Sequence, residues 1–114
     1  MHELSIAINI VEMAEQEARR RGGTHVSAVH LKLGLLSGVV KEALRFSYGV
    51  SCEGTMLEGS ELVIEEAPLV VYCDNCEAER SLCSVQAFFC PFCSTPAPKV
   101  IRGRELELVA MEIN

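Results

Sequence analysis

Two Cys-x-x-Cys pairs, Cys73-Asp74-Asn75-Cys76 and Cys90-Pro91-Phe92-Cys93, decide how this chain is organised, and thirteen residues separate them. Each pair places two thiols on one tight turn, so that both sulfurs can bind one ion. Zn²⁺ takes four such ligands in a tetrahedron, and a closed shell of four cysteines leaves no open position for catalysis. We therefore expect a structural zinc ion, Zn(II), held by Cys73, Cys76, Cys90 and Cys93. Two alternatives stay open: a pair of disulfides, which is typical of secreted chains, and four core cysteines that bind nothing.

Composition excludes several classes of function. The chain has 114 residues and a net charge of −6, which argues against a nucleic-acid partner because backbone binding is driven by Lys and Arg. The sequence has no apolar run long enough to span a membrane. Its N-terminus lacks the basic and apolar regions of a signal peptide. We therefore expect a cytoplasmic protein without a nucleic-acid or membrane partner.

The cysteine pairs interrupt a sequence that otherwise reads as one domain. We expect an α/β domain from residues 1–70 plus 105–114, and a zinc-binding module at 71–104. A module of this size buries little apolar surface, and a metal ion is the usual remedy. Periodicity predicts helices at 4–21 and 39–47, strands at 24–36, 61–67 and 105–113, and a short strand at 100–101.

These elements predict an α+β fold in which two helices cover a three-stranded sheet, with an inserted zinc-ribbon-like module that carries the four paired cysteines. One strand leaves for the module and another returns from it. We therefore expect the strands at 61–67 and 105–113 to be antiparallel neighbours, with the strand at 24–36 beside them.

The first three residues, Met1-His2-Glu3, form a second unusual group. The Met1 amine, the His2 amide and the His2 imidazole can close adjacent chelate rings on one ion, and Glu3 can add a donor. Such nitrogen donors suit Ni(II) or Cu(II). Taken alone the motif also fits an exposed chain end with no metal role.

Together, Met1-His2-Glu3, a helix, a strand ending in Leu35-x-x-Gly38 and the two cysteine pairs resemble the HypA family of hydrogenase nickel-insertion accessory proteins. The resemblance covers essentially the whole chain. It implies a nickel-binding α/β domain and a zinc domain, with transported Ni(II) at His2 and Glu3, the Met1 amine being a further donor. It also implies delivery to the large subunit of [NiFe]-hydrogenase, with a HypB-type GTPase as partner, by a monomer or weak homodimer.

The sequence thus predicts a non-enzymatic nickel metallochaperone. One alternative is a zinc-ribbon interaction adaptor without a nickel role. A metal-dependent hydrolase would need an open zinc position, which a shell of four cysteines denies. Cys52 and Cys83 fall outside the spacing pattern: we expect Cys52 to be partly buried, and Cys83 to be a packing or exposed thiol, with a spare zinc ligand as the lesser alternative. His25 and His30 are expected to be strand residues.

Overall fold

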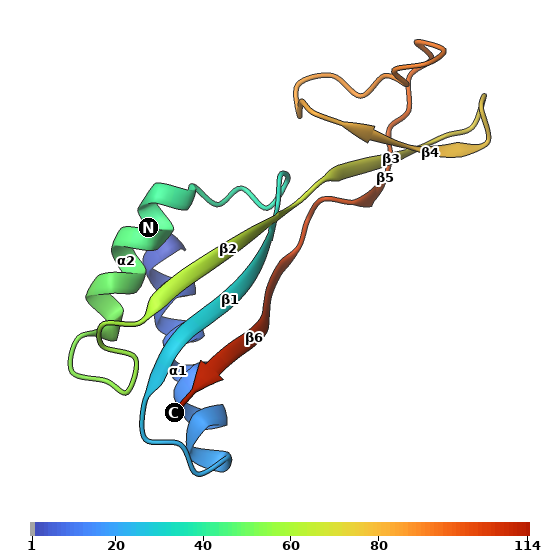
Figure 1. Cartoon of the computed structure of the whole chain (residues 1–114). Helices are drawn as coiled ribbons and strands as arrows, with labels where there is room; N and C mark the ends of the chain where they lie inside the picture. Colours follow the sequence, from blue (N-terminus) through green and yellow to red (C-terminus); the bar gives the residue numbers. More distant parts are fainter. Residues whose placement is uncertain (1) are drawn as a thin grey trace. The chain divides into compact units, whose positions relative to one another are not determined.

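The structure, a computed structural model, describes residues 2–114 (Figure 1). It confirms the predicted α+β class, with helices and two three-stranded sheets. The order of elements along the chain is α1 (His2–Arg20), β1 (Val26–Gly34), α2 (Lys41–Cys52), β2 (Glu61–Ala67), β3 (Leu69–Cys73), β4 (Ala78–Leu82), β5 (Lys99–Arg102) and β6 (Leu106–Ile113).

The chain divides into two compact units. The helical unit comprises the described part of Met1–Leu31, together with Val39–Ile64 and Leu108–Asn114. The cysteine unit comprises Lys32–Gly38 and Glu65–Glu107. The division expected from the sequence, by contrast, assigned residues 32–38 to the larger domain.

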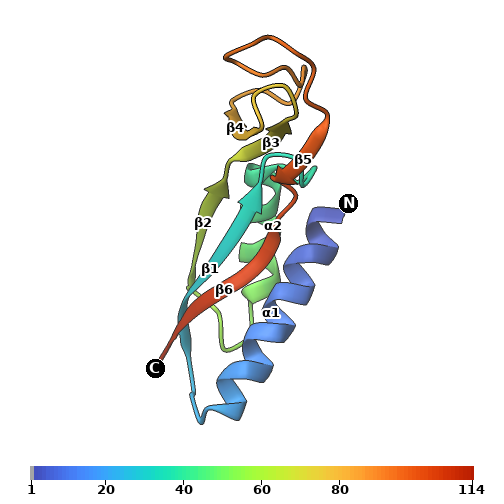
Figure 2. The same ribbon diagram turned by 90° about the vertical axis from the view of Figure 1, so that its right-hand side faces the viewer.

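In the helical unit, α1 and α2 lie on the same face of the sheet (Figure 2). Apolar residues at helical spacing put one stripe of α1 inward. The buried residues of this stripe are Ala7, Ile10, Val11, Ala14 and Ala18. They join a core with Leu44 and Tyr48 of α2 and with Val29 and Leu31 of β1. The small alanines let α1 approach its neighbours closely.

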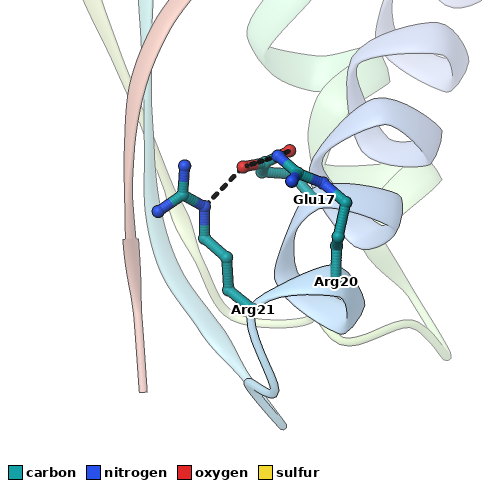
Figure 3. Close-up of polar contacts among 3 residues, drawn as sticks. All are labelled: Glu17, Arg20 and Arg21. Atoms are coloured by element: carbon teal, nitrogen blue, oxygen red, sulfur yellow. Dashed lines mark hydrogen bonds and ion pairs between the residues drawn. The ribbon is translucent and has the colours of Figure 1, made fainter.

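Helix α1 ends in a way that its sequence predicts. Gly22 has a φ of 78°, the left-handed conformation that glycine adopts at low cost. The Gly23 N–H donates to the Ala18 carbonyl at 2.8 Å and closes the last turn. Figure 3 shows the Glu17 carboxylate accepting hydrogen bonds from both Arg20 and Arg21, so these exposed arginines are paired within the helix end.

Helix α2 is longer than predicted. It runs through Tyr48 and Gly49 to Cys52, because Leu44, Tyr48 and Cys52 recur every four residues and are all buried. Phe46, on the opposite side of this helix, is 75% exposed.

The predicted neighbours in the first sheet were wrong. The strand order is β2-β1-β6, so β1 separates the two strands that lead to and from the cysteine unit. Strand β1 runs antiparallel to the β6 segment, since the Gly34 N–H donates to the Glu105 carbonyl while the Asn114 N–H donates to the His25 carbonyl. The physical reason is burial: six of the nine residues of β1 are buried whereas no residue of β6 is, so β1 takes the centre, where neighbours pair both of its edges.

The cysteine unit is built around β3. Antiparallel β4 and β5 pair with its two edges, and Leu69, Val71 and Ala97 form its small core. The short strand predicted at 100–101 is present as β5. Strand β4 was not predicted.

Candidate metal sites

The first cysteine pair lies on the turn of the β3–β4 hairpin. Cys73 ends β3 and pairs with Ala78, the first residue of β4. The Cys76 N–H donates to the Cys73 Sγ at 3.3 Å. Glu77 then reverses the chain with a φ of 53°. The hairpin thus holds both sulfurs on the inside of one turn.

The second cysteine pair also lies on a tight turn in which a backbone N–H donates to a cysteine sulfur. The Phe92 N–H donates to the Cys90 Sγ at 3.4 Å, and the Ser94 N–H donates to the Cys90 carbonyl at 2.9 Å. Ser94, directly after Cys93, has a φ of 62°. A bridge between Phe89 and Pro96 closes the base of this turn.

The two turns bring the four sulfurs together. All four Sγ atoms lie within 4.8 Å of one another. The Cys73–Cys93 sulfurs are 3.5 Å apart and the Cys76–Cys90 sulfurs 3.9 Å apart. Tetrahedral Zn–S bonds of about 2.3 Å require S···S separations of about 3.8 Å. The donor set and its spacing therefore fit a zinc ion, with Cys73 and Cys90 buried and Cys76 and Cys93 partly buried.

The pKa values of the paired cysteines also favour a bound cation. Hydrogen bonds from the Thr95 and Asn75 side chains lower the pKa of the Cys93 thiol to about 5. The Cys76 N–H lowers the pKa of Cys73, but burial and hydrogen bonds to the other thiols outweigh it and raise that pKa to about 11. Four adjacent sulfurs cannot all ionise without a cation among them, and a bound dication would remove this conflict.

At the other candidate site, His2 is the first residue of α1 and its side chain is 62% exposed. Its Nε2 atom lies 3.9 Å from a carboxylate oxygen of Glu3. The predicted Met1 amine donor lies outside the described residues. The imidazole at this helix end is therefore open to an incoming ion.

Glu3 is held more firmly than His2. Its side chain is only 17% exposed, and its carboxylate accepts a hydrogen bond from the Val40 N–H at 3.2 Å. This bond, followed by one from its own backbone N–H, lowers the pKa of the Glu3 carboxyl. Val40 is the N-cap of α2, and its own side chain makes no capping hydrogen bond. A carboxylate is favoured there because helix N-termini carry partial positive charge.

The remaining cysteines and histidines follow their expectations only in part. Cys52 is buried and Cys83 is exposed. His30 lies in β1, as expected, with its Nε2 3.0 Å from the Glu112 carboxylate. His25 is not in a strand but in the segment before β1. Within residues 2–114, the four paired cysteines are the one group of three or more side chains placed to share a metal ion.

Sequence reasoning missed Arg80, a residue of β4 whose side chain interacts with Cys76 and Cys90. It also missed the contact between Glu3 and Val40. No clear sequence signal marked β4, because its residues do not alternate between apolar and polar, and the alternation appears only in their burial in the structure. The Glu3 contact joins residues 37 positions apart, and no local pattern could reveal it.

Over the described residues, no helix is both long and apolar enough to cross a membrane.

Comparison with known proteins identifies what the chain resembles. The family described as "Hydrogenase/urease nickel incorporation, metallochaperone, hypA" matches residues 1–113. The hydrogenase maturation factor HypA of Chloroflexus aurantiacus is 54% identical over 112 residues, which cover 98% of each chain. The corresponding factor of Chloroflexus aggregans is 51% identical with the same coverage.

A solved structure shares the fold at low sequence identity. The solution structure of the Ni metallochaperone HypA from Helicobacter pylori matches with a TM-score of 0.65 and 17% identity, covering 97% of this chain and 96% of that one. The likeness therefore extends to both units of the chain.

Proposed function

Since the chain belongs to the HypA family of nickel-incorporation metallochaperones, we propose that it carries Ni(II) for the maturation of a [NiFe]-hydrogenase. The family match over residues 1–113 supports this proposal. The chain works in the cytoplasm by capture and transfer rather than by catalysis. Its partners are a HypB-type GTPase and the hydrogenase large subunit.

Nickel binds at the N-terminus, through the His2 imidazole, the His2 amide and the Met1 amine. The observation that carries this assignment is the exposed imidazole at the first residue of α1. The first N–H groups of a helix have no acceptor within the helix, so the His2 amide is not committed to helical hydrogen bonding. A site of few, accessible donors suits a carrier, because an acceptor protein can replace the donors one at a time.

Glu3 completes the nickel site as a ligand or as a supporting residue. Its carboxylate is already bonded to the Val40 N–H, which ties the start of α1 to the start of α2. That contact orients the residue next to His2 and places a negative charge beside the captured cation. The Glu3 amide supplies a fourth nitrogen if nickel binds in a plane.

The four paired cysteines hold a structural zinc ion. When bound, zinc links two turns that few apolar contacts stabilise, and it lets all four sulfurs be thiolates. The zinc-binding module is residues 71–104, and residues 1–70 plus 105–114 form the nickel-binding domain. Zinc therefore keeps its module folded and takes no part in carrying nickel.

Nickel transfer tests this function directly. Each chain is first incubated with one equivalent of nickel. It is then mixed with the nickel-free large subunit in the presence of a chelator that removes free nickel, and nickel on the separated subunit is measured. The wild-type chain and His25→Ala, whose histidine is exposed outside the site, should deliver nickel, whereas His2→Ala should not. Equal delivery by His2→Ala would reject the N-terminal site. Loss of delivery by every chain, with zinc retained, would favour a zinc-ribbon adaptor.

A further inference from the structure

Arg80 packs against the second cysteine turn although it comes from β4. It lies opposite Val71 of β3, and its guanidinium carbon is 4.2 Å from the centre of the Phe92 ring. A guanidinium over an aromatic face is a favourable cation–π arrangement. Phe92 in turn donates its N–H to the Cys90 sulfur. Arg80 thereby stabilises the turn that carries Cys90.

The charged end of Arg80 also meets the cysteine sulfurs. It interacts with the side chains of Cys76 and Cys90. These two cysteines belong to different turns, and their sulfurs are 3.9 Å apart. Arg80 therefore lies beside one edge of the four-sulfur cluster, the edge that joins the two turns.

The Nε atom of Arg80 is buried and has no hydrogen-bond partner within residues 2–114. A buried donor without an acceptor is destabilising. Thiolates accept hydrogen bonds more strongly than thiols because they carry charge. Four thiolates around one dication also keep a net negative charge, which a guanidinium would offset. The side chain is thus suited to the metal-bound form of the cluster.

We propose that Arg80 is a positioning residue of the zinc site, which offsets the negative charge at the Cys76–Cys90 edge and holds the second turn through Phe92. The inference rests on the structural zinc proposed above and extends it to a residue that is not a ligand. Groups that orient metal ligands typically contribute about 10–100-fold to metal affinity. In the zinc-bound form, where all four sulfurs are thiolates, Arg80 also makes Cys76 and Cys90 less nucleophilic than they would be without it.

The test compares zinc-loaded wild type with Arg80→Gln, Arg80→Lys and the control Arg102→Gln. Arg102 lies in β5 of the same unit, and its exposed side chain pairs with Glu79. Competition with a chromogenic chelator should show a roughly 10–100-fold weaker zinc affinity for Arg80→Gln, a smaller loss for Arg80→Lys and no change for Arg102→Gln. Alkylation at saturating zinc, mapped by mass spectrometry, should speed up at Cys76 and Cys90 more than at Cys73 and Cys93.

Two results separate this inference from the proposed zinc site. Wild type that holds no zinc would reject the site itself. Wild type that holds zinc, with Arg80→Gln matching it in affinity and in the relative alkylation of the four cysteines, would overturn the role of Arg80 alone. If Arg80→Gln does not fold, Arg80→Lys must still show selective alkylation at Cys76 and Cys90, and its absence would overturn the inference.

Discussion

At the scale of single residues, the six cysteines fall into three environments that a thiol reagent can count. Cys83 is exposed, and four others form the proposed zinc cluster. Cys52 is buried, and burial raises the pKa of its thiol, so that little thiolate forms near neutral pH. We predict one fast-reacting thiol in the zinc-loaded chain, four more after zinc is chelated, and the last only after unfolding in denaturant.

A Cys83→Ser chain provides the control for this count, because it should lose the fast reaction and keep the other two steps. Five thiols reacting at once in the zinc-loaded chain would contradict the assignment of the paired cysteines to a metal.

The residue at the chain end gives a second prediction. Acetylation of the Met1 amine blocks that donor and removes the chelate ring that joins it to the His2 imidazole. Nickel affinity should fall by at least about tenfold, since one of few nitrogen donors is lost. Calorimetry of tag-free protein with and without this acetyl group measures the change. Equal affinities would show that the amine is not a donor.

The residues of the zinc cluster could be predicted from spacing, because two short turns carry all of the information. The environment of Glu3 could not be predicted, because Val40 lies next to it only when α1 packs on α2. Arg80 was missed for a similar reason: its position beside the sulfurs depends on the register of β4 against β3.

At the scale of elements, two glycines make a matched pair for substitution. A Cβ added at Gly34, the last residue of β1, would overlap the Gly103 carbonyl oxygen, whereas one added at Gly49 in α2 would meet nothing within 4 Å. Gly34→Ala should therefore cost about 1–3 kcal/mol in the free energy of unfolding, as overpacking does. Gly49→Ala should add about 1 kcal/mol, because alanine favours the helix.

Urea unfolding of the zinc-loaded chain, followed by circular dichroism, measures both changes. The pair controls for the identical chemical change from glycine to alanine. A Gly34→Ala chain as stable as wild type would mean that β1 and the segment at Gly103 leave room for a Cβ atom between them.

Elements with a clear apolar pattern could be predicted from the sequence, whereas the pairing of the strands in the first sheet could not. Strand β2 has the predicted bounds because its apolar run at residues 62–64 favours a strand and Pro68 follows it. The end of α2 was misjudged because Gly49 resembled a stop signal, while the buried Tyr48 and Cys52 carry the helix onward. The central place of β1 depends on which strand buries the most apolar surface, a property of the assembled sheet.

At the scale of the whole molecule, the two units draw their stability from different sources. The helical unit has an extensive aliphatic core, whereas the buried core of the cysteine unit is three residues and its partly buried neighbours. We predict that Cys73→Ala releases zinc and unfolds the cysteine unit while the helical circular dichroism signal persists. Cys83→Ala, at an exposed cysteine, should change neither.

Proton NMR of Cys73→Ala should accordingly lose the dispersed signals of residues 65–107 and keep those of α1 and α2. Loss of all dispersed signals would show that the helical unit cannot fold without zinc, and the proposed division into two domains would then be wrong.

The central claim, a nickel site at the N-terminus, is tested most directly by a nickel titration of tag-free, zinc-loaded chain. Calorimetry and the d–d absorption of nickel are recorded for wild type, His2→Ala and His25→Ala. The account predicts one nickel ion per chain for wild type and His25→Ala, and loss of that ion in His2→Ala. Stoichiometric nickel binding that survives in His2→Ala would contradict it and move the site elsewhere, with His30 beside Glu112 tested next.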